Sequence, residues 1–244
     1  MFLLLGDHAG NAVPAALGTL GLSREELGRH IALDIGISEL GAALSERLDA
    51  PFIEQRYSRL VVDCNRARGA VDAIPAISDG IAIAGNGAVS DRAARARYAA
   101  IFDPYHGAIG DLLAGRDAAG MPTIVVSLHS FTPVMAGFAR PWTIGVLHDG
   151  GDTRFALATL GALRERAGQG AGGPIGDNVP YRMDGTDHTV PRHAYPRRRP
   201  YAEIEVRQDL LSSPGRISVV ADLLAEVLEC ARRRIGDEPA EGRI

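Results

Sequence analysis

The sequence predicts an α/β fold, a three-layer α/β/α sandwich built around a mostly parallel central sheet. Strand-like runs alternate with helical patterns along the chain, and several of these runs are continuously apolar. Continuous apolar runs are typical of strands buried on both faces of a parallel sheet. Alternation of strands and helices is typical of a sheet covered by helices on both faces. We expect strands near residues 2–5, 51–55, 60–64, 123–128, 143–147 and 202–207.

The helical patterns between these runs have recognisable start signals. Ser23, followed by Glu26, makes a capping box that opens an apolar-periodic stretch over residues 23–48. A second helical pattern covers residues 90–113, and Pro104 should kink or break it because proline lacks the N–H that a helix interior needs. The two remaining helices are expected over 153–166 and 214–234.

Two long segments, 65–89 and 168–201, are rich in glycine and proline and are expected to be loops. Loops of this length in a compact domain tend to be lids or binding loops. No linker divides the chain, so we expect one domain over residues 1–235 and a polar tail over 236–244.

The composition excludes several classes of protein. The net charge is −4 over 244 residues, and arginine and acidic residues are interleaved, which argues against a nucleic-acid partner. No apolar stretch is long enough to span a membrane, and the short N-terminal apolar run lacks the basic leader of a signal peptide. Cys64 and Cys230 have no metal-binding or redox spacing, so we expect a reduced, cytoplasmic protein.

Two histidines occur at the ends of separate strand-like runs. His8 comes shortly after the run 2–5, and His129 directly follows the run 123–128. Ligands of open parallel sheets bind beyond the carboxyl ends of the strands, so these imidazoles should meet at one edge. A catalytic zinc ion takes three protein donors and keeps its fourth position open. Asp34 is the candidate third ligand, and His30, four residues earlier on the same predicted helix face, is the alternative.

Glu205 adds a carboxylate to the same edge of the predicted sheet. On a strand it shares a face with Glu203 and Arg207, whereas Ile204 and Val206 point to the other face. A buried charge is costly unless it is paired or used. Glu205 is therefore a candidate general base, and a strand-end ion pair with Arg207 is the alternative.

The string Asn65-Arg66 follows the predicted strand 60–64. An arginine fork at a strand end can bind a carboxylate with two parallel hydrogen bonds, and Arg59 could add a second cation. Arginine at strand ends is common, so this string alone is only moderately specific.

Six strings occur in a fixed order: Asp-His-Ala-Gly, His-Ile-Ala-Leu-Asp-Ile-Gly, Tyr-Ser-Arg-Leu-Val-Val-Asp-Cys-Asn-Arg, Ser-Leu-His-Ser, Asn-Val-Pro-Tyr and Ile-Glu-Val-Arg-Gln-Asp-Leu. Together they resemble the N-formylglutamate amidohydrolase family over about residues 3–235. The resemblance implies a zinc carboxypeptidase-like, aspartoacylase-like hydrolase fold. It also implies a zinc-dependent enzyme that hydrolyses the amide bond of a small anionic N-acyl amino acid.

Carried over residue by residue, the resemblance implies a zinc ion held by His8 and His129, with Asp34 as the candidate third ligand. Glu205 would be the base. The substrate would contact Arg59, Asn65, Arg66, Asn178, Tyr181 and His193. His106, in Pro-Tyr-His, would support the ligands from behind, as would His30 if it is not itself a ligand.

The chain departs from the family pattern around both histidines. It reads Asp-His-Ala-Gly and Ser-Leu-His-Ser where the formylglutamate enzymes read Pro-His-Ser-Gly and His-Cys-His-Ser, and Asn11 stands where the carboxypeptidase-like relatives carry a glutamate. The identity of the third ligand and of the acyl group therefore stays open.

The alternative functions are those of a carboxypeptidase-type metallopeptidase and of a non-catalytic carboxylate-binding module. A nucleotide-binding protein is excluded, because no glycine-rich phosphate loop follows a strand and the chain contains no lysine.

Overall fold

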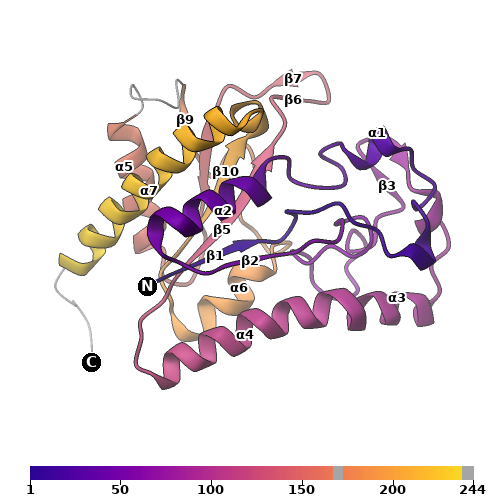
Figure 1. Ribbon diagram of the computed structural model, residues 1–244, viewed down its shortest axis with the longest axis horizontal. Coiled ribbons are helices and arrows are strands. Elements are labelled where there is room, and N and C mark those ends of the chain that lie inside the picture. Colours follow the sequence, from indigo (N-terminus) through magenta and orange to yellow (C-terminus); the bar gives the residue numbers. More distant parts are fainter. Residues whose placement is uncertain (167–172, 238–244) are drawn as a thin grey trace.

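The computed structural model describes residues 1–166 and 173–237. Its centre is a six-stranded sheet in the order β2-β1-β5-β10-β8-β9 (Figure 1). All neighbouring strands are parallel except β8, which runs antiparallel to β10. The strands are β1 (Phe2–Gly6), β2 (Phe52–Glu54), β5 (Ile124–Phe131), β8 (Ile144–Leu147), β9 (Ile175–Asp177) and β10 (Tyr201–Arg207).

Helices cover both faces of this sheet. One face packs against α2 (Ile37–Leu48), α5 (Arg154–Glu165) and α7 (Pro214–Asp237). The other face packs against α4 (Asp103–Ala118) and α6 (Thr189–His193). Alternate residues of β1 divide between the two cores, Phe2 and Leu4 on one side and Leu3 and Leu5 on the other. The predicted three-layer α/β/α sandwich is confirmed, and burial on both sides explains why the strands have continuous apolar sequences.

The predicted helix over residues 23–48 is two helices separated by an irregular segment. The capping box of Ser23 and Glu26 is present, but it begins only the single turn α1 (Arg24–Leu27). The chain re-enters a helix at α2, after Gly36 takes a left-handed conformation with φ of 81°. The intervening residues include Asp34. The expectation that His30 and Asp34 share one helix face is therefore wrong.

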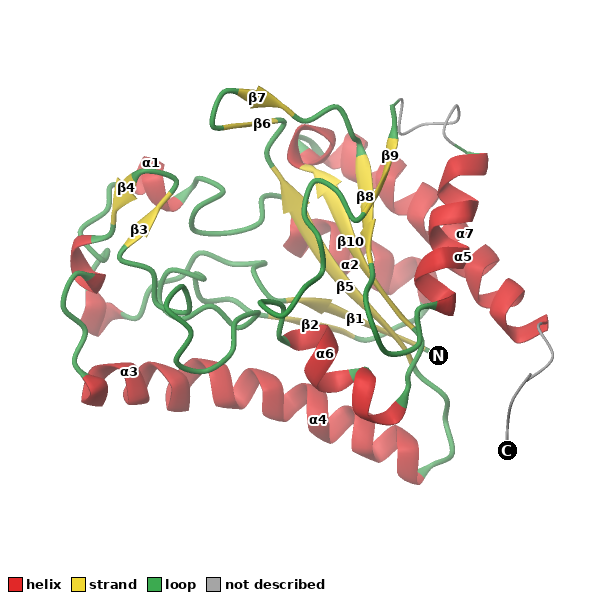
Figure 2. Cartoon of the chain, turned by 180° about the vertical axis from the view of Figure 1, so that it is seen from behind, coloured by secondary structure: helices red, strands yellow, loops and turns green. Residues whose placement is uncertain are grey.

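Pro104 does not break its helix. The helices α3 (Asp91–Arg97) and α4 are joined by a π-helical turn over Tyr98–Phe102, and Pro104 lies in the first turn of α4. Figure 2 shows the two helices running on as one long rod. A π-helical turn changes the hydrogen-bond pattern just before the proline, where its missing N–H and its ring would otherwise disrupt the helix.

The predicted strand over residues 60–64 is wrong. Leu60, Val61 and Val62 are buried, but this segment is a turn whose backbone bonds go to nearby loops, such as Asp63 N–H to the carbonyl of Ala73. The apolar run is explained by packing of these side chains into the core beside α4. The predicted loops are also partly ordered. The segment 65–89 contains the hairpin β3–β4 (Ile77–Ser78 and Ile81–Ala82).

The segment 168–201, so far as it lies within the described residues, contains β9 and α6. A second small hairpin, β6–β7 (Val134–Met135 and Phe138–Ala139), follows β5. Of the predicted tail over 236–244, the first two residues end α7 and the others lie outside the described residues. In the part of the chain that the structure describes, no helix is both long and apolar enough to cross a membrane.

Candidate active site

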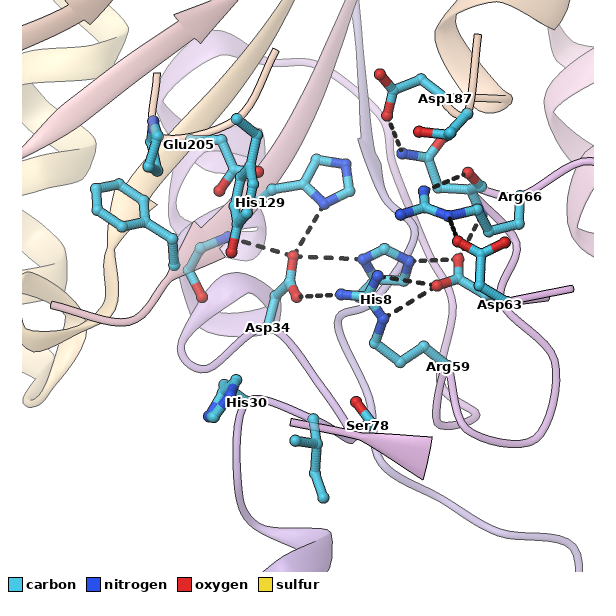
Figure 3. Close-up of a pocket in the computed structure, with 18 of the residues that line it drawn as sticks. His8, His30, Asp34, Arg59, Asp63, Arg66, Ser78, His129, Asp187 and Glu205 are labelled. Carbon is cyan, nitrogen blue, oxygen red and sulfur yellow. Dashed lines mark hydrogen bonds and ion pairs between the residues drawn. The ribbon is translucent and has the colours of Figure 1, made fainter. Parts of the chain in front are cut away.

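A cavity of about 690 Å³ opens at the carboxyl edge of the parallel strands. Its lining includes His8, two residues after the end of β1, and His129, near the end of β5. Glu205, near the end of β10, lies opposite His129 in the strand register. The sheet thus brings these three residues to one edge, as expected for an open parallel sheet. Figure 3 shows them around the cavity.

His8, Asp34 and His129 form a buried cluster within the cavity. Their nearest ligand atoms all lie within 4.8 Å of one another. Asp34 Oδ2 lies 2.9 Å from His129 Nδ1 and 3.5 Å from His8 Nδ1. The backbone N–H of Asp34 donates to the carbonyl of His8, at 2.8 Å, which fixes the irregular segment before α2 against the end of β1. Two imidazoles and one carboxylate therefore converge on one point.

The opposite ring nitrogens of both histidines face other carboxylates. His8 Nε2 donates to Asp63 Oδ1 at 2.7 Å. His129 Nε2 lies 3.1 Å from the hydroxyl of Ser127 and 3.6 Å from Asp7 Oδ2. His8 Nδ1 is buried and has no hydrogen-bond partner among the described residues. A histidine ligand usually binds metal through one nitrogen while the other donates to a carboxylate or carbonyl. An unpartnered buried nitrogen aimed at a carboxylate and a second imidazole fits a metal-binding site.

The electrostatics of the cluster keep its carboxylate ionised. Burial alone would raise the pKa of Asp34, but the charges of His8 and His129 and the hydrogen bond from His129 outweigh it, so the pKa lies well below its ordinary value. Burial would lower the pKa of His129, but its hydrogen bond to Asp34 and the nearby carboxylate of Asp7 raise it well above its ordinary value. In both cases the charged neighbour outweighs the cost of burial.

Arg59 is bound to the cluster rather than free for a ligand. Its Nη1 lies 3.4 Å from Asp34 Oδ1, and its Nη2 lies 2.9 Å from Asp63 Oδ2. Its guanidinium therefore links the candidate ligand Asp34 with Asp63, the carboxylate behind His8. The predicted substrate contact by Arg59 stays a prediction, and these bonds favour a role in holding the cluster.

Glu205 has the environment of a general base. Its side chain is buried, and its Oε2 has no hydrogen-bond partner among the described residues. Burial raises the pKa of Glu205 to about 7, with the positive charge of His129 acting against this rise and the negative charge of Asp34 adding to it. A carboxyl group with a pKa near neutrality can both accept and donate a proton.

Arg66 lines the cavity, but part of its guanidinium is occupied. Nε donates to Asp72 Oδ2 at 2.6 Å, and Nη1 donates to the carbonyl of Asn65 at 3.0 Å. The carboxamide of Asn65 accepts from the backbone N–H groups of His188 and Thr189, both at 2.9 Å. Asn65 thus ties the segment before α6 to the Arg66 loop. A direct contact between Asn65 and substrate stays a prediction.

The three residues expected to line the cavity from the lid side differ in position. Tyr181 lines the cavity, and its hydroxyl accepts from Arg140 Nη1 at 3.0 Å. Asn178 does not line it, because its carboxamide pairs with the backbone N–H and carbonyl of His148, both at 2.9 Å. His193 also lies outside the cavity lining and bonds to His106.

Neither of the two candidate supporting histidines touches the cluster. His30 lines the cavity and lies 3.2 Å from Asp79 Oδ2, not beside Asp34. His106 Nε2 donates to the carbonyl of Cys64 at 3.0 Å, so its Nδ1 accepts from His193 Nε2, also at 3.0 Å. His106 therefore holds the backbone between Asp63 and Asn65 instead of a candidate ligand.

Reasoning from sequence missed the carboxylates behind the histidines. Asp7 and Asp63 are both almost fully buried, and Tyr105 donates its hydroxyl hydrogen to Asp7 Oδ1 at 2.6 Å. The available signals were an aspartate directly before His8 and the aspartate two residues before Asn65. Neither signal identifies its histidine partner, because that pairing depends on the tertiary fold.

Comparisons with known proteins agree with this fold. The family model of N-formylglutamate amidohydrolase matches residues 1–212. The gene product Atu2144 of Agrobacterium tumefaciens is 38% identical, with a TM-score of 0.91 over 97% of this chain and 92% of that one. An N-formylglutamate amidohydrolase from Ralstonia eutropha JMP134 has the same fold at 18% identity, with a TM-score of 0.62 over 96% and 94%. No curated protein matches the chain significantly.

The fold and the family match over residues 1–212 define an amidohydrolase. The chain belongs to the N-formylglutamate amidohydrolase family, which hydrolyses an N-acyl amino acid. The resemblance found in the ordered motifs of the sequence is confirmed.

The hydrogen-bonded pair of buried His106 and half-buried His193 predicts acid sensitivity. Burial lowers the pKa of His106 to about 4 and that of His193 to about 3, with Arg192 and His188 adding to the effect and Asp7 opposing it. Below the unfolded-state pKa of about 6.5, the unfolded chain then binds more protons than the folded one. Stability should therefore fall as the pH is lowered from about 6.5 towards 4. We expect a smaller loss of Tm over this range in His193→Gln than in the wild type. An equal loss in both proteins would contradict the assignment.

Proposed function

We propose that the protein is a zinc-dependent amidohydrolase that cleaves the amide bond of a small anionic N-acyl amino acid. The products would be a carboxylate and a free amino acid. One observation carries the proposal: two buried imidazoles each turn Nδ1 towards Asp34 and Nε2 towards a carboxylate. That arrangement is typical of metal-binding histidines. Membership of the amidohydrolase family supports the reaction type.

His8, Asp34 and His129 would hold the zinc ion. Two nitrogen donors and one oxygen donor are a common protein ligand set for catalytic zinc. When bound, zinc supplies Lewis acidity for the amide carbonyl and for the attacking water. Asp63 accepts from His8 Nε2, and Asp7 lies close to His129 Nε2. The two carboxylates would therefore keep the proton of each imidazole on Nε2 and leave Nδ1 free to bind the metal.

Glu205 would move the proton. Its carboxylate would accept a proton from the water that attacks the carbonyl carbon, and would then deliver that proton to the nitrogen as the C–N bond breaks. A pKa near 7 suits both steps, because the same group must first gain a proton and then lose it at one pH. Its place opposite His129 in the register puts this carboxylate beside the candidate metal site.

Arg66 would bind the carboxylate of the substrate. It lines the cavity, and Asp72 holds its guanidinium in one orientation. Holding the substrate at a fixed distance from the metal site places the amide close to its reactive geometry. Asn65 would support Arg66 by fixing the loop that carries it, and Tyr181 would line the cavity beside Glu205.

The metal site is tested by zinc content. His8→Ala and His129→Ala should each lose bound zinc and activity, because two protein donors hold a catalytic ion poorly. Asp34→Ala should do the same. The matched control is His148→Ala, since His148 pairs with Asp177 and does not line the cavity. Metal analysis and turnover measurements check this. Stoichiometric zinc in a His8→Ala protein would overturn the ligand assignment, and a folded wild type that never binds zinc would favour the non-catalytic binding module.

Glu205→Gln should separate catalysis from binding. Glutamine keeps the shape of the side chain but cannot accept the proton, so kcat should fall by roughly 10²–10⁴-fold while zinc stays bound. Glu165→Gln, an exposed change on α5, is the control and should leave kcat unchanged. A near-normal kcat in Glu205→Gln would show that this residue is not the base.

Arg66→Lys should weaken the carboxylate contact, because lysine keeps the charge but lacks the planar fork. Loss of a desolvated charge pair costs about 2–5 kcal/mol, or one and a half to three and a half decades of kcat/KM. The penalty should vanish when the α-carboxylate of the substrate is replaced by an amide. Arg47→Lys, in the last turn of α2 and outside the cavity lining, is the control. An equal penalty on both substrates would mean that Arg66 maintains the loop and does not bind substrate.

A further inference from the structure

The cavity is strongly acidic. Eight carboxylates line it, against three arginines and three histidines. The carboxylates belong to Asp34, Asp63, Asp72, Asp79, Asp184, Asp187, Glu203 and Glu205. A site built for a substrate with two negative charges would need an excess of cations, because like charges in a partly desolvated cavity repel one another. A bound divalent cation would not reverse this balance.

The arginines of the cavity already have partners or lie at its exposed side. Arg59 is held between Asp34 and Asp63, and Arg66 is paired with Asp72. Arg182 is exposed, and its charge acts on Asp184. Once Arg66 binds the α-carboxylate of a substrate, no buried arginine of the lining remains for a second carboxylate.

Two of the carboxylates have no cationic partner. Within the described ranges, no arginine or histidine lies at ion-pair distance from Asp187 or Glu203, and burial raises the pKa of both carboxyl groups above its ordinary value. Asp187 accepts only from neutral groups, the side-chain amide of Asn65 at 3.3 Å and the backbone N–H of Asp184 at 3.0 Å. Glu203 is 2% exposed, lines the cavity, and has an Oε2 without a hydrogen-bond partner. A buried carboxylate without a partner is costly and is usually explained by a ligand or a functional role.

Asp187 and Glu203 line the same cavity as Arg66 and the cluster of His8, Asp34 and His129. Asp187 accepts from the side-chain amide of Asn65, the residue directly before Arg66, so it lies beside the loop that carries the proposed carboxylate clamp. Figure 3 shows Asp187 on the Arg66 side of the cluster. Glu203 lies two residues before Glu205 on the same face of β10, and the charge of Asp187 acts on it. Both carboxyl groups therefore face the cavity that also contains Arg66 and the cluster.

We propose that the amino-acid part of the substrate carries a basic side chain, an ammonium or guanidinium group, which is bound by Asp187 and Glu203. This inference rests on the proposed function, since it takes Arg66 as the partner of the α-carboxylate. A basic side chain would compensate both unpaired carboxylates. A glutamate side chain would supply no cation to either group and would oppose the ionisation of both.

The wild-type protein tests this with two panels of substrates, the N-formyl and the N-acetyl forms of arginine, lysine, glutamine and glutamate. Substrates are compared only within one panel, so that the acyl group is the same. We expect kcat/KM for the basic substrates to exceed that for the glutamate substrates by at least about tenfold, with glutamine between them. Equal or better hydrolysis of the glutamate or glutamine substrates would overturn the inference and leave the proposed function intact. Hydrolysis of none of them would contradict the proposed function itself.

Charge-removing variants locate the subsite. Asp187→Asn and Glu203→Gln keep the shape of each side chain, so each should lower the ratio of kcat/KM for arginine over glutamate substrates by about tenfold. Asp222→Asn, which removes the same charge from the exposed surface of α7, is the control and should keep the wild-type ratio. Calorimetry with free arginine and free glutamate, at matched zinc content, gives a readout independent of turnover. A wild-type ratio in both variants, or tighter binding of glutamate than arginine by the wild type, would refute the assignment.

Discussion

The buried carboxylate of Asp34 is the interaction on which the rest of the site depends. It faces the Nδ1 atoms of His8 and His129, and it accepts from the backbone N–H of Ser130 at 3.3 Å. It therefore joins the end of β1, the end of β5 and the irregular segment before α2. A buried charge of this kind is tolerated only while its partners are present, and loss of one partner leaves the others uncompensated. The position of Asp34 is thus a condition both for the fold at this edge and for any metal bound there.

A second set of contacts extends this order to the other layer. Asp7 accepts from Tyr105 on α4, and Asp63 bonds to His8 and Arg59. His106, also on α4, holds the backbone next to Asp63. The long rod of α3 and α4 therefore supports the histidines from the face opposite α2. Such supporting contacts fix the orientation of each imidazole, which is what a metal site requires.

The sequence identifies the parts of the site that depend on local pattern. His8, His129 and Glu205 can be identified because each lies at or near the end of a strand-like run, and a parallel sheet brings such ends together. The apolar run over 60–64 is buried, as its composition indicates, but it is a turn, since burial alone does not specify strand pairing. The irregular segment between α1 and α2, which contains Asp34, is held by contacts with His8 and Ser130. These two residues are far from Asp34 in the sequence, so local pattern could not predict where the helix is interrupted.

The partners of the functional residues could not be predicted in the same way. Nothing in the string Asp-x-Asn-Arg shows that its aspartate contacts His8, or that Asn65 fixes the segment before α6. These pairings are tertiary, so they depend on which loops the sheet and helices bring together. Glu203 is a related case: the alternation along β10 places it on the same face as Glu205, but only the structure shows that its carboxylate is unpaired.

X-ray absorption spectroscopy of the zinc-loaded protein tests the central claim most directly, because it reports the donors around the ion without relying on turnover. If His8, Asp34 and His129 bind the zinc ion, the nearest atoms are nitrogen and oxygen donors at about 2.0–2.2 Å, and the spectrum shows the scattering of two imidazole rings. Replacing His129 by alanine should remove one imidazole from any residual signal. A sulfur donor next to the zinc ion, or the absence of imidazole scattering, would contradict this set of ligands.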